Sequence, residues 1–217
     1  NDEMPLDEAM AASQFESLNS YSDRIVHDDG GKDHLAAMLF ARALDYYLVQ
    51  DLDNALKDLN QAVETNDKQF AAYFNRALVR YKLLQVKKAQ ETDITADNAL
   101  SAAFGVKNYN KVELTQVVEY NGIRQDFDKA IQLAPDFVYA YYNRGNLSME
   151  SKDYRAALMD YDKALSMDKE LAEAYYNRGL CHLEMGKKSE GIADLSKAGE
   201  LGLYSAYNIL KRFSDSK

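Results

Sequence analysis

The feature that most constrains this chain is a short phrase that returns at a spacing of 34 residues. Residues 141–145 read YYNRG, and the same five letters return at 175–179. Upstream, 73–77 read YFNRA and 39–43 read LFARA, a looser copy. A repeat of about 20–45 residues is typical of a solenoid, whose units bury their apolar faces only by stacking on neighbours. The spacing therefore predicts a stacked array.

Each copy of the phrase is followed by a second amphipathic segment, so every unit holds two helices. The second segments lie at 55–62, 127–130, 157–164 and 192–198. Only 2 Pro and 10 Gly in 217 residues favour long helices with short connections. We predict four units, at 36–69, 70–137, 138–171 and 172–205, within an array at 36–213 that ends in a capping helix at 206–213.

At these positions the chain resembles the tetratricopeptide repeat family, over about residues 36–205. The family places a bulky residue at repeat position 4, small residues at 8 and 20, an aromatic at 24 and Ala at 27. Ala occurs at position 27 in all four units, as Ala62, Ala130, Ala164 and Ala198. The resemblance implies an all-α, right-handed superhelical solenoid of antiparallel helix pairs, of bacterial type. Residues 198–203 resemble the shorter Sel-like repeats and give the array a Sel-like C-terminal end.

Two departures from the family pattern stand out. Position 7, usually Leu, is occupied by Arg42, Arg76, Arg144 and Arg178. We interpret these arginines as structural groups that lay their stems on the core and reach nearby carboxylates or helix ends, in preference to a functional row. The second unit is 68 residues long, which is 34 too many. We predict a long insertion at about 88–112, with one short helix near 96–104, in preference to two degenerate repeats.

Charge is concentrated at the N-terminus. Residues 1–35 carry nine acidic and two basic residues, whereas the remaining 182 are nearly neutral. Such a chain is expected to bind neither nucleic acid nor an anionic membrane surface, and no apolar run is long enough to span a bilayer. Within this acidic arm, 6–21 can form an amphipathic helix that caps the first repeat or belongs to a linker. The absent initiator Met and the likeness to bacterial arrays favour the periplasm or cell envelope over the cytoplasm.

Residues that could carry out chemistry are scarce. His27 and His34 lie among aspartates, but their spacing fits neither a zinc site nor a calcium loop. Cys181 and His182 are adjacent in one helix, so their side chains point about 100° apart and form no nucleophile–base pair. We therefore expect no enzyme activity, no metal and no cofactor.

Aromatic and amide residues instead follow the face of each first helix that lines the groove in tetratricopeptide arrays. Position 5 is aromatic in every unit, and position 6 is Asn in the last three. Aromatic rings can hold apolar side chains of a guest, and an amide can pair with a peptide backbone. The expected binding residues are Phe40, Phe74, Asn75, Tyr139, Tyr142, Asn143, Tyr176 and Asn177.

Two functions follow from this pattern. The first is a non-catalytic scaffold that binds a peptide or protein segment in its concave groove. The alternative is a structural C-terminal region of a larger cell-envelope protein that packs against its own upstream domain. Family members that bind acidic chaperone tails use a set of Lys, Asn and Arg residues at five groove positions. In units one to three these positions hold Phe40, Leu44, Asn75, Tyr139 and Asn143. Only Asn75 matches, so such tails are not expected as ligands.

Overall fold

Helices account for nearly all of the chain that the structure, a computed structural model, describes. It describes residues 31–97 and 109–214, with side chains at 31–90 and 118–212. These ranges form nine α-helices and no β-strand, which confirms the predicted all-α class. The chain divides into two units, one ending at Leu133 and the other beginning at Ala134. The helix predicted at 6–21 lies outside the described residues.

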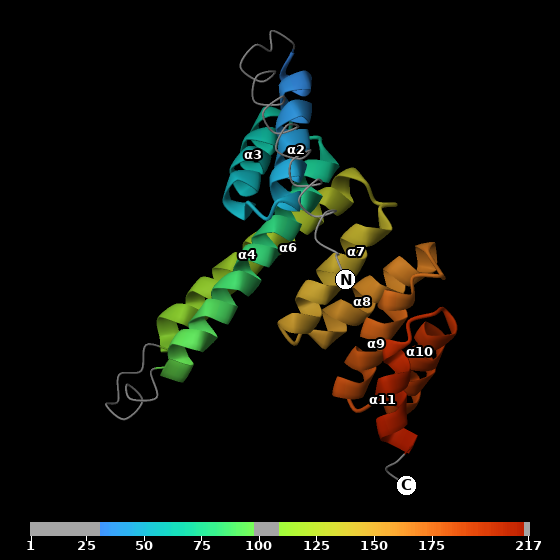
Figure 1. The fold of residues 1–217 in the computed structure, drawn as a ribbon. Coiled ribbons are helices and arrows are strands. Elements are labelled where there is room, and N and C mark those ends of the chain that lie inside the picture. Colours follow the sequence, from blue (N-terminus) through green and yellow to red (C-terminus); the bar gives the residue numbers. More distant parts are fainter. Residues whose placement is uncertain (1–30, 98–108, 215–217) are drawn as a thin grey trace, which may run out of the picture. The chain divides into compact units, whose positions relative to one another are not determined.

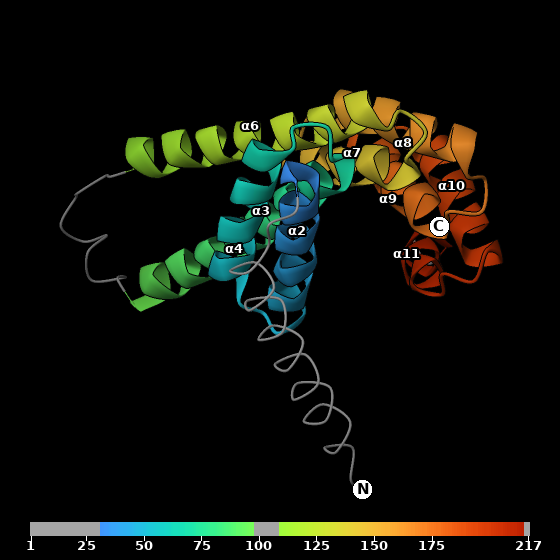
Figure 2. The ribbon, with the colours of Figure 1, turned by 90° about the horizontal axis from the view of Figure 1, so that it is seen from above.

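Unit 1 contains two helix pairs. The first pair is α2 (Lys32–Leu48) and α3 (Leu52–Thr65), and the second is α4 (Phe70–Asp97) and α6 (Tyr109–Leu133). Leu39 and Leu59, each 1% exposed, anchor the core between α2 and α3. The helices α4 and α6 run side by side and extend well past the first pair (Figures 1 and 2).

Unit 2 contains two pairs and a final helix. Helices α7 (Val138–Glu150) and α8 (Tyr154–Met167) form the first pair, and α9 (Ala172–Glu184) and α10 (Lys188–Glu200) the second. Helix α11 (Ser205–Ser214) packs on α10. The alanines at position 27 of all four repeats are fully buried, because only a small side chain lets neighbouring helix backbones approach closely.

The turn between the two helices of a pair has the same geometry in three repeats. The residue at position 15 has a positive φ, 63° at Gln50 and at Lys152 and 77° at Gly186. The next residue donates its amide to a carbonyl five residues back, the hydrogen bond of a Schellman turn, at Asp51, Asp153 and Lys187. Asp51 and Asp153 then cap the following helix by accepting a backbone N–H with their side chains.

The second repeat lacks this turn. Its position 15 is Leu84, which is 3% exposed and lies inside α4, and its position 16 is Gln85 rather than a capping residue. Leu84 is buried within the helix and no capping residue follows it, so the first helix continues to Asp97. The limits of the predicted insertion, 88 and 112, therefore do not coincide with helix ends. Residues 88–97 continue α4 and 109–112 begin α6, while most of the short helix predicted near 96–104 lies outside the described residues.

The arginines at position 7 are structural, as the sequence indicated. Each forms two parallel hydrogen bonds, of 2.5–3.0 Å, with the carboxylate at position 23 of its own repeat. The four pairs are Arg42–Asp58, Arg76–Asp126, Arg144–Asp160 and Arg178–Asp194. A planar guanidinium fits a carboxylate in this way, so each pair holds the first helix of a repeat against the second.

Two of these arginines also reach the preceding repeat. Arg76 donates to Asn60 at 3.2 Å, and Arg178 donates to Asp162 at 2.7 Å. In both cases the acceptor lies at position 25 of the repeat before. The same side chain thus joins the two helices of one repeat and ties that repeat to its neighbour.

Candidate functional site

Five of the eight predicted binding residues lie on α7 and α9, the first helices of successive repeats, which contact each other in unit 2. On α7 the spacing of three and four residues places Tyr139, Tyr142, Asn143 and Asn146 along one stripe. Tyr176 and Asn177 lie on α9. The other three predicted residues belong to unit 1 and lie on α2 and α4.

A hydrogen-bonded network of Tyr142, Asn146 and Asn177 joins these helices. The amide nitrogen of Asn177 donates to Asn146 Oδ1 at 2.8 Å and to the Tyr142 hydroxyl at 3.3 Å. The same Asn146 oxygen accepts the hydroxyl of Tyr161, on α8, at 2.8 Å. Because Tyr161 is fully buried, the network is anchored in the core below. Three helices therefore hold the two amides in a defined orientation.

Tyr142 is the aromatic member of this network. Its ring is tilted against that of Tyr161, with centroids 6.2 Å apart. Partial burial raises the pKa of the Tyr142 hydroxyl above its ordinary value, so the group stays neutral at physiological pH. A neutral hydroxyl both donates and accepts, which suits a partner's backbone.

The asparagines at position 6 of the second and third repeats are oriented by their own helices. Asn75 donates to the Ala71 carbonyl and Asn143 to the Tyr139 carbonyl, each at 2.8 Å. An amide has two N–H donors and one acceptor oxygen, so each side chain retains a donor and an acceptor for another partner. Asn143 and Asn177 thus occupy equivalent positions but make different contacts.

The aromatic row at position 5 contributes part of its surface to helix packing. Phe40 packs on the core of the first helix pair, and the Phe74 ring lies 6.0 Å from that of Phe127. Tyr176 packs against the buried cluster beneath α11. Tyr139, at position 2, is 51% exposed. Among the predicted rings, Tyr139 therefore offers the most surface to a partner.

Asn146 is a candidate site residue that the sequence pattern did not single out. It occupies position 9 of the third repeat, a groove position at which the first repeat has Leu44. The sequence feature that could have indicated it is an Asn at position 9 followed by an Asn at position 6 of the next repeat, here Asn146 and Asn177. Only the packing of α7 on α9 brings the two amides within hydrogen-bonding distance.

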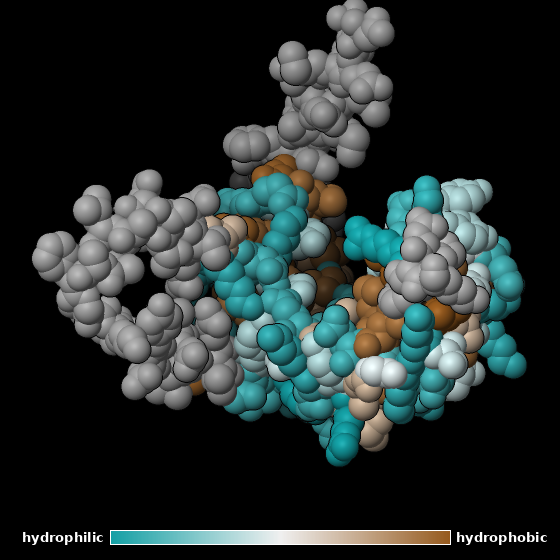
Figure 3. Space-filling model, turned by 90° about the horizontal axis from the view of Figure 1, so that it is seen from below, coloured by the Kyte–Doolittle hydropathy of each residue, from teal (hydrophilic) through white to brown (hydrophobic). Residues whose placement is uncertain are grey.

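On the face drawn in Figure 3, hydrophilic residues predominate and apolar side chains reach the surface in separate patches. None of the helices in the described ranges is long and apolar enough to cross a membrane. Across the same ranges, no three His, Cys, Asp or Glu side chains are grouped as a metal ion would require.

Comparison with known proteins agrees with this architecture. A TPR repeat model matches residues 145–186, and a tetratricopeptide repeat model matches 172–201. No curated protein matches the sequence.

Several solved structures share the fold. A crystal structure of MamA is 15% identical, with a TM-score of 0.66 over 95% of this chain and 99% of that chain. MamA 41-end from Desulfovibrio magneticus RS-1 is 14% identical, with a TM-score of 0.65 over 93% and 96%. The Arabidopsis OM64 TPR domain is 16% identical, with a TM-score of 0.53 over 71% and 99%. At these identities the likeness concerns the fold, and the two model matches identify tetratricopeptide repeats within residues 145–201 of this chain.

Proposed function

We propose that this chain is a protein-interaction scaffold and that unit 2 binds an extended segment of a partner protein along α7 and α9. The observation that carries the proposal is the network of Tyr142, Asn146 and Asn177, in which polar side chains of successive repeats are oriented before any partner arrives. Side chains that are already ordered lose little further entropy on binding, which favours affinity.

The surroundings of the network suit a peptide. Asn143, next to Tyr142, retains one amide N–H and its carbonyl oxygen, the two groups that pair with a peptide C=O and N–H. Tyr139, one turn earlier on α7, offers a half-exposed ring to an apolar side chain of the partner. Backbone pairing supplies affinity for extended peptides in general, and the ring supplies selectivity.

In unit 1, Phe40, Phe74 and Asn75 remain a second predicted patch. Asn75 is oriented like Asn143, but the rings of Phe40 and Phe74 are partly occupied by packing. We therefore assign the main binding energy to α7 and α9. No acidic tail is expected as the partner, since the network contributes amides and a hydroxyl rather than cations.

A displayed library of random peptides, selected on the 217-residue chain, would supply a ligand for titration. We expect Tyr139→Ala and Asn143→Ala each to weaken binding about tenfold or more, which corresponds to about 1.4 kcal/mol. Tyr142→Phe keeps the ring but removes the hydroxyl that accepts from Asn177, so it should weaken binding less.

The matched control is Met159→Ala, which removes a 74% exposed apolar side chain from α8 and should leave affinity unchanged. Circular dichroism and a melting curve check that every variant folds. Normal affinity of both Tyr139→Ala and Asn143→Ala would place binding elsewhere. A selection that yields no binder would favour the alternative, a surface that packs against another domain of a larger protein.

A further inference from the structure

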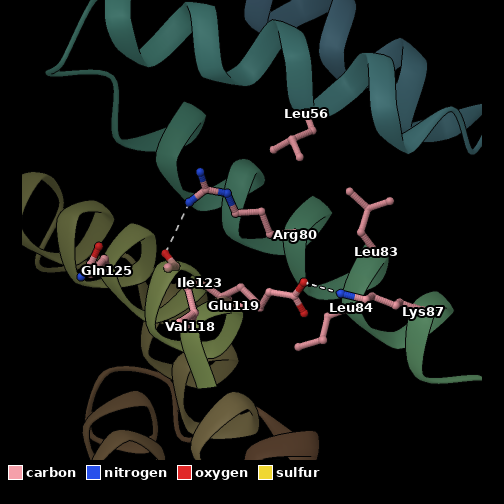
Figure 4. A pocket seen from close by; sticks show the side chains of 10 residues that line it. Leu56, Arg80, Leu83, Leu84, Lys87, Val118, Glu119, Ile123 and Gln125 are labelled. Atoms are coloured by element: carbon pink, nitrogen blue, oxygen red, sulfur yellow. Dashed lines mark hydrogen bonds and ion pairs between the residues drawn. The ribbon is translucent and has the colours of Figure 1, made fainter. Parts of the chain in front are cut away.

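Charged side chains are balanced in one hollow of the molecule and unbalanced along the α7–α9 surface. The hollow, of about 490 Å³, lies in unit 1 where α3 meets α4 and α6 (Figure 4). Of the two bases that line it, Arg80 donates to Asp126 at 2.6 Å. The other, Lys87, pairs with Glu119 at 2.8 Å (Figure 4). Because each base has a carboxylate partner, the lining of the hollow does not select a charged ligand.

Two glutamates of α9, by contrast, lie on the same face as the Asn177 amide of the network. Glu173 precedes Asn177 by four residues, and Glu184 follows it by seven. At about 100° per residue, these spacings place the three side chains within about 40° of one another around the helix. Both glutamates are exposed, and Glu184 accepts from the Tyr154 hydroxyl at 3.5 Å. The face of α9 that carries the amide is therefore acidic.

Glu173 lies close to the Tyr142 hydroxyl on the neighbouring helix. Burial is the main reason that the pKa of this hydroxyl is raised, and the negative charge of Glu173 raises it further. Glu173 has no hydrogen-bond or ion-pair partner among the residues that the structure describes. The network therefore has an exposed carboxylate beside it whose charge is not compensated by a contact.

Neither α7 nor α9, both of which the structure describes in full, has a base on this face. Each helix contains one Arg, Arg144 or Arg178, about 140° around the helix from repeat position 2. Both guanidinium groups are bound by aspartates of the following helix. His182 is on the opposite face of α9, with Nε2 3.8 Å from Asp194. The charge of the acidic face is therefore not offset from within these helices.

The loops near Glu173 add to this negative charge. The loops that lead into α7 and α9, at 134–137 and 168–171, together contain three acidic residues and one basic residue. Lys152 and Lys187 follow the two helices, and each helix of 13 residues is about 20 Å long, so these bases lie at the far end. The acidic excess is therefore greatest around the start of α7 and α9.

Helix formation does not require the acid at residue 173. An acidic residue in the first turn stabilises a helix through the macrodipole. The equivalent residue is Ala71 in α4 and Tyr139 in α7, and neither of these helices has an acidic residue in its first turn. Helices of this array therefore form without a carboxylate at this position.

We propose that the segment bound along α7 and α9 is basic, and that one of its Arg or Lys side chains lies between Tyr139 and Glu173. These two residues occupy position 2 of successive repeats, on helices that contact each other. The Tyr139 ring rests against Phe137, with centroids 5.8 Å apart, and stays 51% exposed. The apolar stem of Arg or Lys can lie on this ring while the charged end pairs with the Glu173 carboxylate. The proposal rests on the binding function proposed above and defines the chemistry of its partner.

Peptides selected from the displayed library on the 217-residue chain test the charge of the partner. We expect them to contain Arg or Lys, and their affinity to fall about five- to tenfold when that residue is replaced by neutral citrulline or norleucine. Glu173→Gln should weaken binding of the basic peptide by a similar factor. It should leave binding of the neutral peptide unchanged, because that ligand has no charge for the carboxylate to pair with. Tyr139→Phe keeps the ring and should bind both peptides normally.

The matched control is Glu190→Gln, which changes an exposed glutamate in the first turn of α10 and should leave both affinities unchanged. Selected peptides that bind this surface, as judged by their sensitivity to Asn143→Ala, but contain no base would overturn the basic partner and leave the proposed function intact. Equal weakening of the basic and neutral peptides by Glu173→Gln would also overturn it. A selection without binders, or binders insensitive to both Tyr139→Ala and Asn143→Ala, would overturn both proposals.

Discussion

At the scale of single residues, each repeat is held together by an arginine and an aspartate. The carboxylates of Asp58 and Asp126 are only 3% and 4% exposed, while their arginines keep some contact with water. A buried carboxylate is costly unless it is fully paired, so breaking one pair should cost more than the pair itself contributes. The two parallel hydrogen bonds also set the angle between the helices, which a single contact would not do.

The pair in the third repeat allows a direct measurement. We expect Asp160→Ala to reduce the free energy of unfolding by about 2–4 kcal/mol, because the Arg144 guanidinium loses its partner in a largely buried place. Arg144→Leu with Asp160→Leu should restore most of that loss, since an apolar pair needs no desolvated charge. Urea unfolding of both variants gives the comparison, and equal losses would show that the ion pair itself supplies net stability.

Gly145 is a second residue whose identity is dictated by packing. A Cβ built there would lie 2.8 Å from the Tyr161 ring, and that ring is fully buried and held by its hydrogen bond to Asn146. Gly145→Leu should therefore destabilise the protein by about 2–4 kcal/mol.

Gly122→Ala is the matched control for Gly145→Leu. The nearest atom to a Cβ at Gly122 is 3.8 Å away, so this substitution inside a helix should stabilise by about 0.5–1 kcal/mol. Thermal melting distinguishes the two. A melting temperature unchanged by Gly145→Leu would mean that α7 and α8 can separate without cost.

At the scale of elements, α11 closes one end of unit 2. Ala206 is fully buried with Leu195 and Ala198 of α10, and Ile209 and Leu210 pack around them. The Tyr207 ring lies over Gly199, where a Cβ would come within 2.7 Å of it. These contacts cover an apolar face of α10, as a terminal helix does in a repeat array.

A pair of substitutions tests whether α11 acts as a cap. Ala206→Asp places a carboxylate in this cluster and should destabilise the protein by about 3 kcal/mol or more. Tyr204→Ser, two residues before Ala206, removes a ring that is 78% exposed and should change stability little. Urea unfolding compares the two. Equal stability of both variants would mean that α11 is not needed to cover α10.

At the scale of the whole molecule, the large contacts between helices join neighbours in the chain, as in other repeat arrays. A destabilising substitution should therefore act mainly on its own part of the array. Cys181 is the natural reporter for unit 2. It is fully buried, and burial raises the pKa of its thiol to about 11, so the thiol reacts only when α9 opens.

Labelling of Cys181 by a thiol reagent near neutral pH measures this opening. We expect Gly145→Leu in unit 2 to accelerate labelling at least about tenfold. Leu59→Ala, in the core of unit 1, should lower the stability of that unit by about 2–5 kcal/mol but change the labelling rate far less. Equal acceleration by both would show that the array opens as one cooperative body.

The sequence by itself determined the helix pairs, the repeat register and the final helix, because these follow from local periodicity and from small residues that recur every 34 positions. It also contained the reason for the long helices of the second repeat, since Leu84 and Gln85 replace the turn and cap found at Gln50 and Asp51.

Only the tertiary structure decided which side chains meet. Arg76 and Asp126 are 50 residues apart in the sequence, whereas the residues of the other three pairs are 16 apart. The contact is nevertheless the same, because α4 and α6 pack on each other at these residues as the two helices of the other repeats do. The amides of Asn146 and Asn177 come together for a related reason, the stacking of α7 on α9. Helices form from neighbouring residues, whereas the partner of a side chain depends on how helices distant in sequence pack, and a local pattern does not contain that packing.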